Sequence, residues 1–541
     1  MKPTFQQRGN YTTVESYVKA HVGELNPDLS GAYPKLKDAE QLFLRAVNRK
    51  DRIAIYGDYD CDGVTSLSIF KRLCDALKVP VLLIAPGRFA DGYGINESRV
   101  ETLIASGVQT ILTVDNGIAA FPALQRAKEA GLTVIVLDHH AQVGDSLPDA
   151  DVICDPHVTG GDDKHDFDDL CGAGLSYLFA KDIIETAAPS KKDVIDECLV
   201  LAMLGTVADV VTLRYDNRYI VQQGLKLMHR GICPAGLAGI FDILAVDAKS
   251  VTEEDIAWKI APLINAAGRM ANKGASVMVE ILSADKAEDV QKRIEQAVHA
   301  NELRKELCDN MFWRAKLYVK SLGTVPSFIV YVDNSKETAG IAGIVASKIA
   351  ETYRVPALVL TKKGDIYKGS GRTYDTIDLL ETLVQAKTEV PSLQFGGHAG
   401  ACGASVPCAD IDLLRKVLSD ITPKSPDHEL NTFWYDLNVP AKKLPDVLVD
   451  EWALGPFGAG CPLPVLHTKL HAVKDIEMGN GRHVKFLTKE GIDVVFWDGA
   501  TNDECTAFRN SSRKVLDVVG SLSENEWQGN RRLQFTVSAM Q

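Results

Sequence analysis

The sequence of 541 residues lacks the marks of several protein classes. No apolar run reaches the roughly 18 residues that predict a membrane span, and the opening MKPTFQQRGNYTT contains no apolar stretch typical of a secretory signal. The 11 cysteines are scattered without a C-x-x-C pair. This distribution predicts reduced thiols in a cytoplasmic protein, and it argues against zinc held by cysteine clusters. The lack of a long apolar run predicts that the protein has no membrane partner.

Positive charge is also scarce. The chain has 59 Lys and Arg against 72 Asp and Glu, which gives a formal net charge of −13. Phosphate contacts need Lys and Arg, so this balance argues mildly against a nucleic-acid-binding protein. A local basic groove can still bind DNA on an acidic body. Carboxylates clustered at a metal site would also make the net charge more negative.

An alternating pattern of strands and helices occupies residues 50–140. The apolar runs lie at 52–56, 80–85, 109–114 and 132–137. They are separated by helix-like stretches at 63–77, 96–106 and 119–130. Strands about 25 residues apart with helices between them predict a parallel sheet with right-handed crossovers. No G-x-G-x-x-G follows the first strand, which argues against a dinucleotide site.

The remaining chain divides by composition. Helix-like stretches dominate from 172 to about 240, and 290–322 is a charged stretch without Gly or Pro that predicts a long helix. Strand candidates follow at 325–332 and 355–360, and a series of short strand candidates after the linker PKSPDH favours a small barrel of the OB type. We therefore expect an α/β protein with a first α/β domain and N-terminal extension at 1–280, a linking helix at 281–322, a second α/β domain at 323–425 and an OB-type β-barrel at 429–541.

The stretch YGDYDCDG places Asp58, Asp60 and Asp62 at alternate positions before a glycine. This spacing also opens the calcium loop of an EF-hand. The twelfth position of such a loop would be Ile69 instead of the required Glu, and the preceding residues predict a strand where an EF-hand has a helix. The pattern therefore argues against a calcium loop, and the carboxylates need another explanation.

Acidic and histidine residues follow three of the four expected strands. The first strand precedes the three aspartates above, the third ends at Asp115, and the fourth ends at Asp138, His139 and His140. Ligands bind at the carboxyl ends of strands in open parallel sheets. Asp209 lies in an apolar helical stretch, where a buried carboxylate needs a partner or a metal. Helix capping is the alternative for a single aspartate such as Asp115, and a buried Asp–His pair is the alternative for the fourth strand.

This set of oxygen and imidazole ligands suits divalent ions of the Mn²⁺ or Mg²⁺ type. Two such ions roughly 3.5–4 Å apart can share a carboxylate and activate a water molecule. Enzymes use that arrangement for hydrolysis at phosphorus. The residues alone therefore indicate a metal site of the kind that hydrolyses bonds at phosphorus.

The motifs YGDYDCDG, VDNGI, LDHH and GTVADVV, in this order, resemble the four motifs of the DHH phosphoesterase superfamily. Other stretches resemble its RecJ family of single-strand exonucleases, from about residue 25 to the end: PGRFADGYG, LCGAGLSY, PLINAAGRM, GIVASKIAE, GSGR, FGGHAGACGAS and LGPFGAGCPLPV. The resemblance implies a DHH domain, a long helix, a DHH-associated domain with the GGH motif, and an OB domain.

The resemblance also implies roles for the clustered residues. It implies that five residues hold two divalent ions, with Mn²⁺ preferred to Mg²⁺: Asp60, Asp62, Asp115, His139 and Asp209. Asp115 would bridge the two ions. It further implies that His140 faces the scissile phosphate, and that Asp58 and Asp138 orient the ligands.

A second set of residues would contact the substrate. His398 in the GGH motif would contact its phosphate, and Gly397 would allow a close approach of the backbone. The resemblance assigns a phosphate site for the 5′ end to Arg269, Ser370 and Arg372, because the Arg fork matches phosphate oxygens. A surface salt bridge is the alternative for any one Arg. Asn116 and Arg88 are further candidates.

The chain departs from the family pattern at three places. Tyr56 stands where many relatives have a His, so a ligand of the first ion is missing or is replaced by Asp58, which leaves the metal preference open. Cys461 stands where Asn is common, and ETA precedes GIAGIVASK where a His is common. None of these changes removes a core carboxylate.

The resemblance implies a 5′-to-3′ exonuclease on single-stranded DNA that releases nucleoside 5′-monophosphates in DNA repair or recombination. It implies a monomer, with a single-strand-binding protein or a helicase as further partners. The alternatives are a DHH phosphodiesterase for short oligonucleotides and a non-catalytic scaffold that binds single strands. At most two of the C-terminal aromatics are expected to contact DNA: Trp452, Phe457, Phe496, Trp497 and Trp527.

Overall fold

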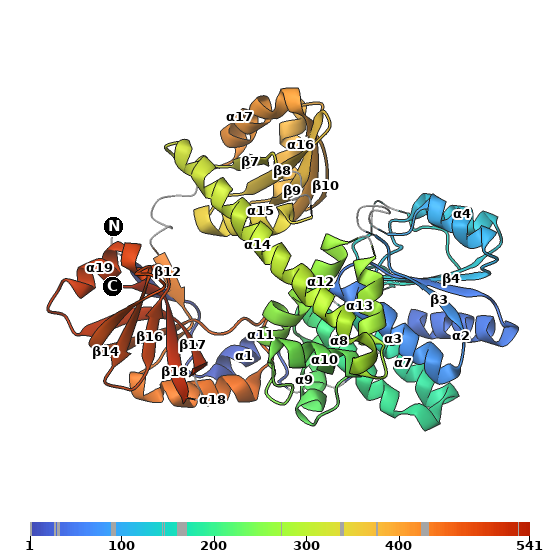
Figure 1. The fold of residues 1–541 in the computed structure, drawn as a ribbon, viewed down its shortest axis with the longest axis horizontal. Coiled ribbons are helices and arrows are strands. Elements are labelled where there is room, and N and C mark those ends of the chain that lie inside the picture. Colours follow the sequence, from blue (N-terminus) through green and yellow to red (C-terminus); the bar gives the residue numbers. More distant parts are fainter. Residues whose placement is uncertain are drawn as a thin grey trace. The chain divides into compact units, whose positions relative to one another are not determined.

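A computed structural model describes most of the chain (Figure 1). The described residues are 3–25, 29, 33–87, 94–142, 144, 146–159, 170–271, 273–335, 340–374, 377–423, 432–527 and 530–541. The chain forms two compact units. The first comprises residues 1–265, 275–294 and 431–541, and the second comprises 266–274 and 295–430.

The first unit contains a parallel sheet with the strand order β3-β2-β4-β5-β6. Its strands are β2 (Ile53–Tyr56), β3 (Val81–Ile84), β4 (Thr110–Val114), β5 (Thr133–Leu137) and β6 (Val152–Cys154). The four predicted strands are thus confirmed to within a residue or two at each end. β6 was not predicted, because three residues are too short for a pattern to be recognised. The predicted α/β fold class is confirmed.

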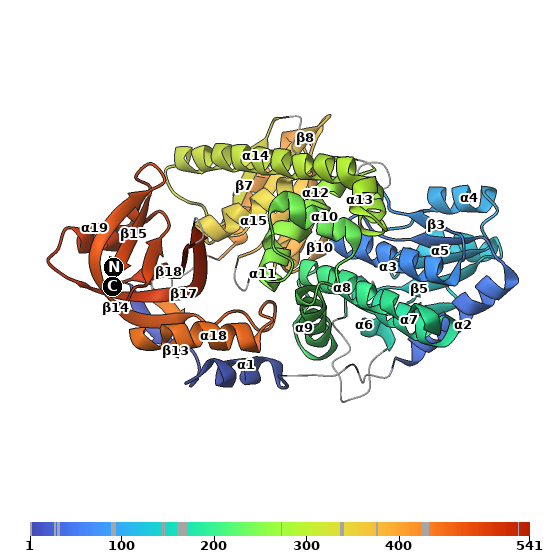
Figure 2. The same ribbon diagram turned by 60° about the horizontal axis from the view of Figure 1, so that its bottom comes forward.

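Helices cover both faces of this sheet (Figure 2). On one face, side chains of α4 and α5 pack against alternate residues of the strands, such as Ala54 and Val134. On the other face, the rings of Phe43, Phe70 and Phe179 contact one another in edge or tilted arrangements at centroid distances of 5.2–6.4 Å. The helices that surround the sheet are α2 (Pro34–Arg49), α3 (Cys61–Leu77), α4 (Glu97–Ala105), α5 (Phe121–Glu129), α6 (Pro156–Thr159) and α7 (Gly172–Ala187).

A helical layer follows the sheet along the chain, as the composition predicted. It comprises α8 (Asp193–Ala208), α9 (Tyr215–His229), α10 (Ala235–Leu244), α11 (Glu253–Asp255), a π-helical turn (Ile256–Ile260), α12 (Ala261–Met270) and α13 (Gly274–Leu282). α8 packs against both α3 and α7, and these three helices lie side by side in Figures 1 and 2. The predicted long helix is α14 (Gln291–Ser321), with 31 residues.

The second unit is built on a mixed sheet with the order β10-β11-β9-β8-β7. Its elements are β7 (Ile329–Asp333), α15 (Ala342–Tyr353), β8 (Ala357–Lys363), β9 (Ile366–Arg372), α16 (Leu379–Glu389), β10 (Gln394–His398), β11 (Ala401–Pro407) and α17 (Ile411–Ile421). Only β7 and β8 were predicted. The other strands contain the glycines of the GSGR and GGH motifs, and glycine has low strand propensity.

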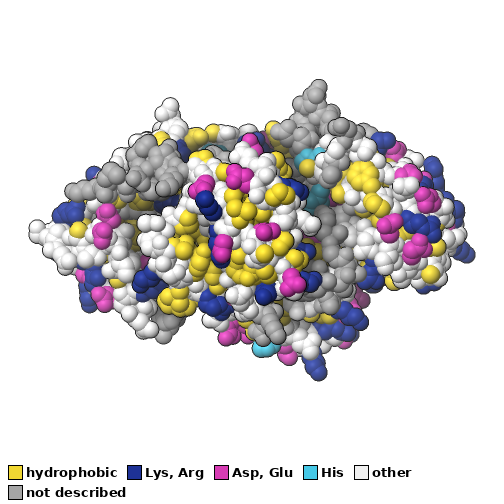
Figure 3. All heavy atoms as spheres, turned by 90° about the horizontal axis from the view of Figure 1, so that it is seen from above, with side chains coloured by type: hydrophobic (Ala, Val, Ile, Leu, Met, Phe, Trp, Pro, Cys, Tyr) yellow, Lys and Arg dark blue, Asp and Glu magenta, His cyan; other side chains and the backbone are white. Residues whose placement is uncertain are grey.

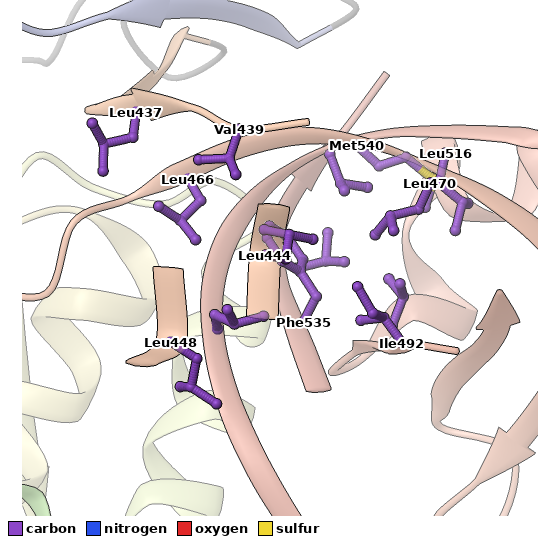
Figure 4. Close-up of a cluster of buried hydrophobic side chains, with 14 of the residues drawn as sticks. Leu437, Val439, Leu444, Leu448, Leu466, Leu470, Ile492, Leu516, Phe535 and Met540 are labelled. Atoms are coloured by element: carbon purple, nitrogen blue, oxygen red, sulfur yellow. The ribbon is translucent and has the colours of Figure 1, made fainter. Parts of the chain in front are cut away.

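The C-terminal segment forms a closed barrel, which confirms the predicted OB domain. Its strands are β14 (Leu466–Met478), β15 (His483–Thr488), β16 (Asp493–Phe496), β17 (Val515–Trp527) and β18 (Asn530–Met540), and β17 pairs back onto β14. The helices are α18 (Leu444–Leu454), before the barrel, and α19 (Asp503–Arg509), between β16 and β17. Leu466, Leu470 and Phe535 are among the buried side chains that point into the interior (Figure 4). The alternation of buried and exposed residues at the start of β14 is that of a strand with one buried face.

The N-terminal segment packs against this barrel domain. β1 (Thr4–Gln7) pairs in parallel with β12 (Thr432–Tyr435), and the two-residue β13 (Leu437–Asn438) pairs with β14. α1 (Val14–Val22) places Val14, Tyr17, Val18 and Val22 in the buried cluster of the barrel domain. The domain boundaries that the sequence suggests stay predictions, but the contacts of β1 and α1 are with the C-terminal domain. Among the described residues, no helix is both long enough and apolar enough to cross a membrane.

Glu451 makes the stability of the barrel domain depend on pH. This residue of α18 is only 4% exposed, and burial, with a further contribution from Asp450, raises its pKa to about 8. The unfolded chain ionises this carboxyl near pH 4.3, so the folded state loses stability as the pH rises from there through about 8. Glu451→Gln should therefore match the native protein at pH 4 and become more stable by a few kcal/mol above pH 8.

Melting temperatures of both proteins across this pH range test the expectation. Glu389→Gln, at an exposed position of α16, is the matched control. If the native protein and the Glu451 variant lose stability in parallel over the whole range, Glu451 is not the group responsible.

Candidate metal centre

The carboxyl ends of β2, β4 and β5 bring three acidic loops to one edge of the parallel sheet. Asp58, Asp62, Asp115 and Asp138 are all buried there. Three groups of possible metal ligands have their ligand atoms within 4.8 Å of one another: Asp115, His139 and His140; Asp62, His139 and Asp209; and Asp58, Asp60 and Asp115. The predicted convergence of the strand ends on one site is therefore what the structure shows.

His139 lies at the centre of this cluster. Its Nε2 atom is 3.1 Å from Asp115 Oδ1, 3.6 Å from Asp62 Oδ2 and 3.7 Å from Asp209 Oδ2. Burial lowers the pKa of His139 despite the surrounding carboxylates. The neutral imidazole that results is the form that binds a metal ion.

The start of α7 holds Asp62 in place. Asp62 Oδ2 accepts a hydrogen bond from Gly172 N at 2.7 Å, and Oδ1 accepts one from Ala173 N at 2.8 Å. Unpaired N–H groups at a helix N-terminus favour a negative charge. Asp60 caps α3 by accepting a hydrogen bond from Gly63 N at 3.1 Å. The alternative of helix capping therefore applies to Asp60, and a capping oxygen leaves the second oxygen of the carboxylate for another partner.

Glycines make this close packing possible. A Cβ at Gly172 would lie 2.7 Å from Asp115 Cβ, and one at Gly205 would lie 2.4 Å from Ala173 Cβ and 2.7 Å from Asp62 Oδ1. A side chain at either position would push the carboxylates apart. These two glycines are structural members of the site that the sequence reasoning did not identify. Gly172 lies in the family motif LCGAGLSY, and Gly205 lies in GTVADVV.

Asp138 orients the two histidines. Its Oδ1 atom accepts hydrogen bonds from His139 N at 2.8 Å and His140 N at 3.3 Å, and it lies 2.7 Å from His140 Nδ1. Its Oδ2 atom accepts a hydrogen bond from Ile118 N at 2.8 Å. Burial opposes protonation of His140, but the hydrogen bond and charge of Asp138 outweigh it and raise the His140 pKa to about 9.

Asp115 carries both strain and uncompensated charge. Its φ of 59° lies in the left-handed region, which costs energy for a residue with a side chain. Burial, followed by the charges of Asp62 and the other aspartates, raises its pKa well above the ordinary value. Its buried Oδ2 atom has no hydrogen-bond partner among the residues that the structure describes. An orphaned oxygen within a group of like charges fits a divalent cation, and the oxygen and imidazole donors fit Mn²⁺ or Mg²⁺.

Asp209 is placed differently from expectation, and Tyr56 lies in the core. Asp209 is the C-terminal cap of α8 and is not inside the helix, and its side chain is 27% exposed, so the premise that it is buried was wrong. Tyr56, which replaces the His of many relatives, has its side chain in the core between the sheet and α4, where its hydroxyl donates to Gly94 O at 3.3 Å. It does not substitute for a metal ligand.

Two other candidates have different outcomes. Asn116 is buried beside the cluster, where its Nδ2 atom donates to Tyr56 O at 3.2 Å and to Val114 O at 2.8 Å. It thereby ties β2 to β4, and its place in substrate binding stays a prediction. Arg88 lies outside the described residues.

Asn265 and Asp155 adjoin the site and were not predicted. Asn265 Oδ1 accepts a hydrogen bond from Cys61 N at 2.8 Å, which fixes the start of α3. Asp155 follows β6, and burial, with a contribution from Asp138, raises its pKa to about 7. Recognition of β6 as a strand would have placed Asp155 at the same sheet edge.

The second unit holds the other predicted substrate-binding residues. Ser370 and Arg372 lie on β9, and a Cβ at Gly343 in the first turn of α15 would be 2.9 Å from Arg372 Nη2 and 3.5 Å from Ser370 Cβ. These two side chains therefore meet at the N-terminus of a helix, which favours anions. His398 is exposed at the end of β10, and Arg269 lies in the last turn of α12.

Gly397 has a structural reason to be glycine. Its φ is 146°, and a Cβ there would lie 2.3 Å from Ala401 O on the paired strand β11. This position of β10 therefore depends on a residue without a side chain.

Comparison with known proteins agrees with this architecture. The chain matches the models of the DHH family N-terminal domain over residues 52–206, the DHHA1 domain over 325–423 and the RecJ OB domain over 435–539. The single-stranded-DNA-specific exonuclease RecJ of Thermus thermophilus is 30% identical over 93% of this chain and 70% of its own length. The single-stranded-DNA-specific exonuclease RecJ of Bacillus subtilis is 30% identical over 93% of this chain. This chain spans only 63% of the length of the Bacillus subtilis protein.

A solved structure has a similar fold. The crystal structure of RecJ from Thermus thermophilus in complex with Mn²⁺ matches with a TM-score of 0.81 at 25% identity. The match covers 99% of this chain and 79% of the other. From the ordered motifs, the fold of each domain and these relatives, we conclude that the chain belongs to the RecJ family of the DHH phosphoesterase superfamily.

Proposed function

We propose that this protein is a metal-dependent exonuclease that degrades single-stranded DNA from the 5′ end and releases nucleoside 5′-monophosphates. The observation that carries the proposal is the cluster in which His139 meets the buried carboxylates of Asp62 and Asp115 and the partly exposed carboxylate of Asp209. Relatives named as single-stranded-DNA-specific exonucleases support the choice of substrate. We place the activity in DNA repair or recombination.

The cluster residues have distinct tasks in this proposal. Bound Mn²⁺ or Mg²⁺ ions would activate the attacking water and neutralise charge on the phosphate. Asp60, Asp62, Asp115, His139 and Asp209 would hold the ions, and Asp58 would orient these ligands. Asp138 holds His140, whose partly exposed ring would face the scissile phosphate. A protonated His140 beside the phosphate would stabilise the negative charge that develops there in the transition state.

The second unit would bind the strand by its phosphates. Arg372 and Ser370 of β9, which lie beside the start of α15, would hold the 5′ phosphate together with Arg269. His398 would contact a phosphate near the scissile bond. On the face drawn in Figure 3, Lys and Arg side chains are interspersed with Asp and Glu. We assign the positive charge that contacts the DNA phosphates to Arg372 and Arg269.

The barrel domain offers exposed aromatics for base stacking. Phe457 and Phe496 are buried, whereas Trp452 is 58% and Trp497 53% exposed. The side chain of Trp527 lies outside the described residues. Trp497 follows β16 and makes an edge contact with His483 at the start of β15, at a centroid distance of 4.9 Å. The second and third strands form the ligand face of OB domains, so we assign stacking to Trp497.

Trp497→Ala should weaken the binding of single-stranded DNA by about five- to tenfold, the lower end of the range for one stacked base. Fluorescence anisotropy with a labelled oligonucleotide measures the change. Trp434→Ala, which removes an exposed Trp from β12, is the control and should leave affinity unchanged. Equal losses in the two variants would show that Trp497 has no special place in binding.

The proposed activity is tested with DNA labelled at either end, in Mn²⁺ or Mg²⁺. A 5′ label should be released at once as a mononucleotide, while 3′-labelled strands shorten progressively and a blunt duplex resists. Cleavage confined to very short oligonucleotides would favour the phosphodiesterase alternative. Binding without cleavage in either metal would favour the scaffold. Addition of a single-strand-binding protein or a helicase to the assay tests those partners, and sedimentation tests the monomer.

A further inference from the structure

A turn at the entrance to the barrel domain docks onto the DHH domain within the first unit. This docking turn, residues 454–461, carries the sequence LGPFGAGC. Hydrogen bonds between Gly458 and Cys461, at 2.9 and 3.1 Å, close it into a tight reverse turn. The turn therefore presents a rigid surface to its neighbour.

Arg218 of α9 anchors one side of the docking turn. Its fully buried guanidinium donates to Pro456 O at 2.9 Å, to Gly455 O at 3.3 Å and to Leu454 O. Glu253 Oε1 accepts a hydrogen bond from Phe457 N at 2.7 Å. These contacts satisfy successive backbone groups of the turn, which would be costly to leave buried without partners.

The other side of the docking turn rests on the residues that follow Asp209. Leu213 N donates to Ala459 O at 2.9 Å. A Cβ at Gly460 would lie 2.3 Å from Thr212 Cγ2, and one at Gly458 would lie 2.9 Å from Leu213 Cδ1. The turn therefore touches both the backbone and the side chains of this segment.

The segment between Asp209 and these contacts is strained. Val210 has a φ of 60° and is 69% exposed. The left-handed conformation is a genuine outlier for a β-branched residue. Such strain persists only where the surroundings hold it. Asp209 holds it on one side, as the cap of α8, and the docking turn holds it on the other.

We infer that the docking turn is a positioning element for Asp209, so that the barrel domain helps to assemble the metal centre as well as to hold DNA. The inference rests on the metal centre proposed above but does not depend on the exonuclease activity. Thr212 and Leu213 are the positioning residues, because the turn acts through them on the short segment that begins at Asp209. Displacement of Thr212 should move this carboxylate away from His139 and weaken metal binding.

Gly460→Ala in the full chain tests the inference, because the new methyl group must displace Thr212. Gly491→Ala is the matched control. Both glycines belong to the barrel domain and have similar φ values, 72° and 76°, but a Cβ at Gly491 meets nothing within 4 Å. The two substitutions therefore impose the same backbone strain, and only one of them touches the segment after Asp209.

Mn²⁺ titration calorimetry on each purified protein is the readout. We expect Gly460→Ala to bind Mn²⁺ about tenfold more weakly than Gly491→Ala, the scale of loss seen when a ligand is poorly oriented. The double change Gly460→Ala with Thr212→Ser removes the methyl group that the new Cβ would strike, and it should restore the affinity. Rescue would show that the effect passes through Thr212 and is not a general loss of folding.

Other results would overturn the inference. Equal Mn²⁺ affinity in Gly460→Ala and Gly491→Ala would show that the turn only joins the domains. A loss that Thr212→Ser does not restore would show that it acts by another route. If the native protein itself binds no Mn²⁺, the metal centre and this inference both fail. Binding of Mn²⁺ with the expected losses, but without DNA cleavage, would support the inference while contradicting the proposed activity.

Discussion

Asp115→Asn is expected to lower the rate of strand hydrolysis by about a thousandfold, which corresponds to about 4 kcal/mol of lost transition-state stabilisation. An amide oxygen carries no charge and cannot bridge two cations as a carboxylate does. Asn tolerates the left-handed backbone conformation at this position, so the turn should survive. The loss should therefore be one of metal binding and chemistry and not of folding.

The stability of the metal-free protein gives a second readout for this variant. Burial, followed by the neighbouring negative charges, raises the pKa of Asp115, so removal of its carboxylate charge should relieve both the desolvation cost and the repulsion. We expect the metal-free variant to melt slightly above the native protein, and Mn²⁺ to stabilise the native protein more than the variant.

Single-turnover hydrolysis and melting curves with and without Mn²⁺ measure the two effects of Asp115→Asn. Asp75→Asn, at an exposed position of α3, is the control and should behave as the native protein does. An Asp115→Asn protein that retains native activity would remove this residue from the metal centre. A variant that is inactive because it is unfolded would contradict the assignment of the loss to chemistry.

Asp138→Asn is expected to weaken Mn²⁺ binding or activity by about 10- to 100-fold, the usual range when a group that orients metal ligands is lost. The native carboxylate accepts hydrogen bonds from His139 N, His140 N and Ile118 N. In the Asn variant an NH₂ group replaces one of the two oxygens, so it must point at a backbone N–H group that donated to that oxygen. Two donors cannot form a hydrogen bond with each other, so the Asn side chain should rotate and no longer hold His140.

Asp151→Asn provides the matched control for Asp138→Asn. Asp151 Oδ2 accepts hydrogen bonds from Val134 N and Lys128 Nζ, both at 2.7 Å, so its replacement disturbs a similar contact near β5. It is not among the groups of possible metal ligands in the described residues. Calorimetry with Mn²⁺ should separate the two variants. Equal affinities in both would show that Asp138 supports the fold and not the metal centre.

The parallel sheet and its acidic edge were predictable from the sequence. Strands such as β4 and β5 are buried along almost their whole length and consist of β-branched residues and leucine, and helices of ordinary length separate them, so the local pattern is strong. Asp115 and Asp138 follow these strands directly, and the topology of a parallel sheet then requires them to meet. The resemblance to the DHH superfamily added the roles of single residues to this reasoning.

Other members of the site depend on contacts between distant segments, which no local pattern contains. Gly172 and Gly205 look like ordinary helix residues until α7 and α8 are packed against Asp62. Asp209 has the sequence context of a buried helical residue, but α8 ends at Ala208 and leaves it half-buried. Asn265 accepts a hydrogen bond from the backbone amide of Cys61, which lies 204 residues away in the sequence.

For this protein, local patterns of side chains determined which strands, helices and carboxylates exist, because strand and helix periodicity depends on near neighbours in the chain. The packing of distant segments decided how those carboxylates are held, which aromatics stay exposed and how the docking turn meets the segment after Asp209. Those features follow from steric fit and from the pairing of buried polar groups, and both of these arise only when the chain is folded.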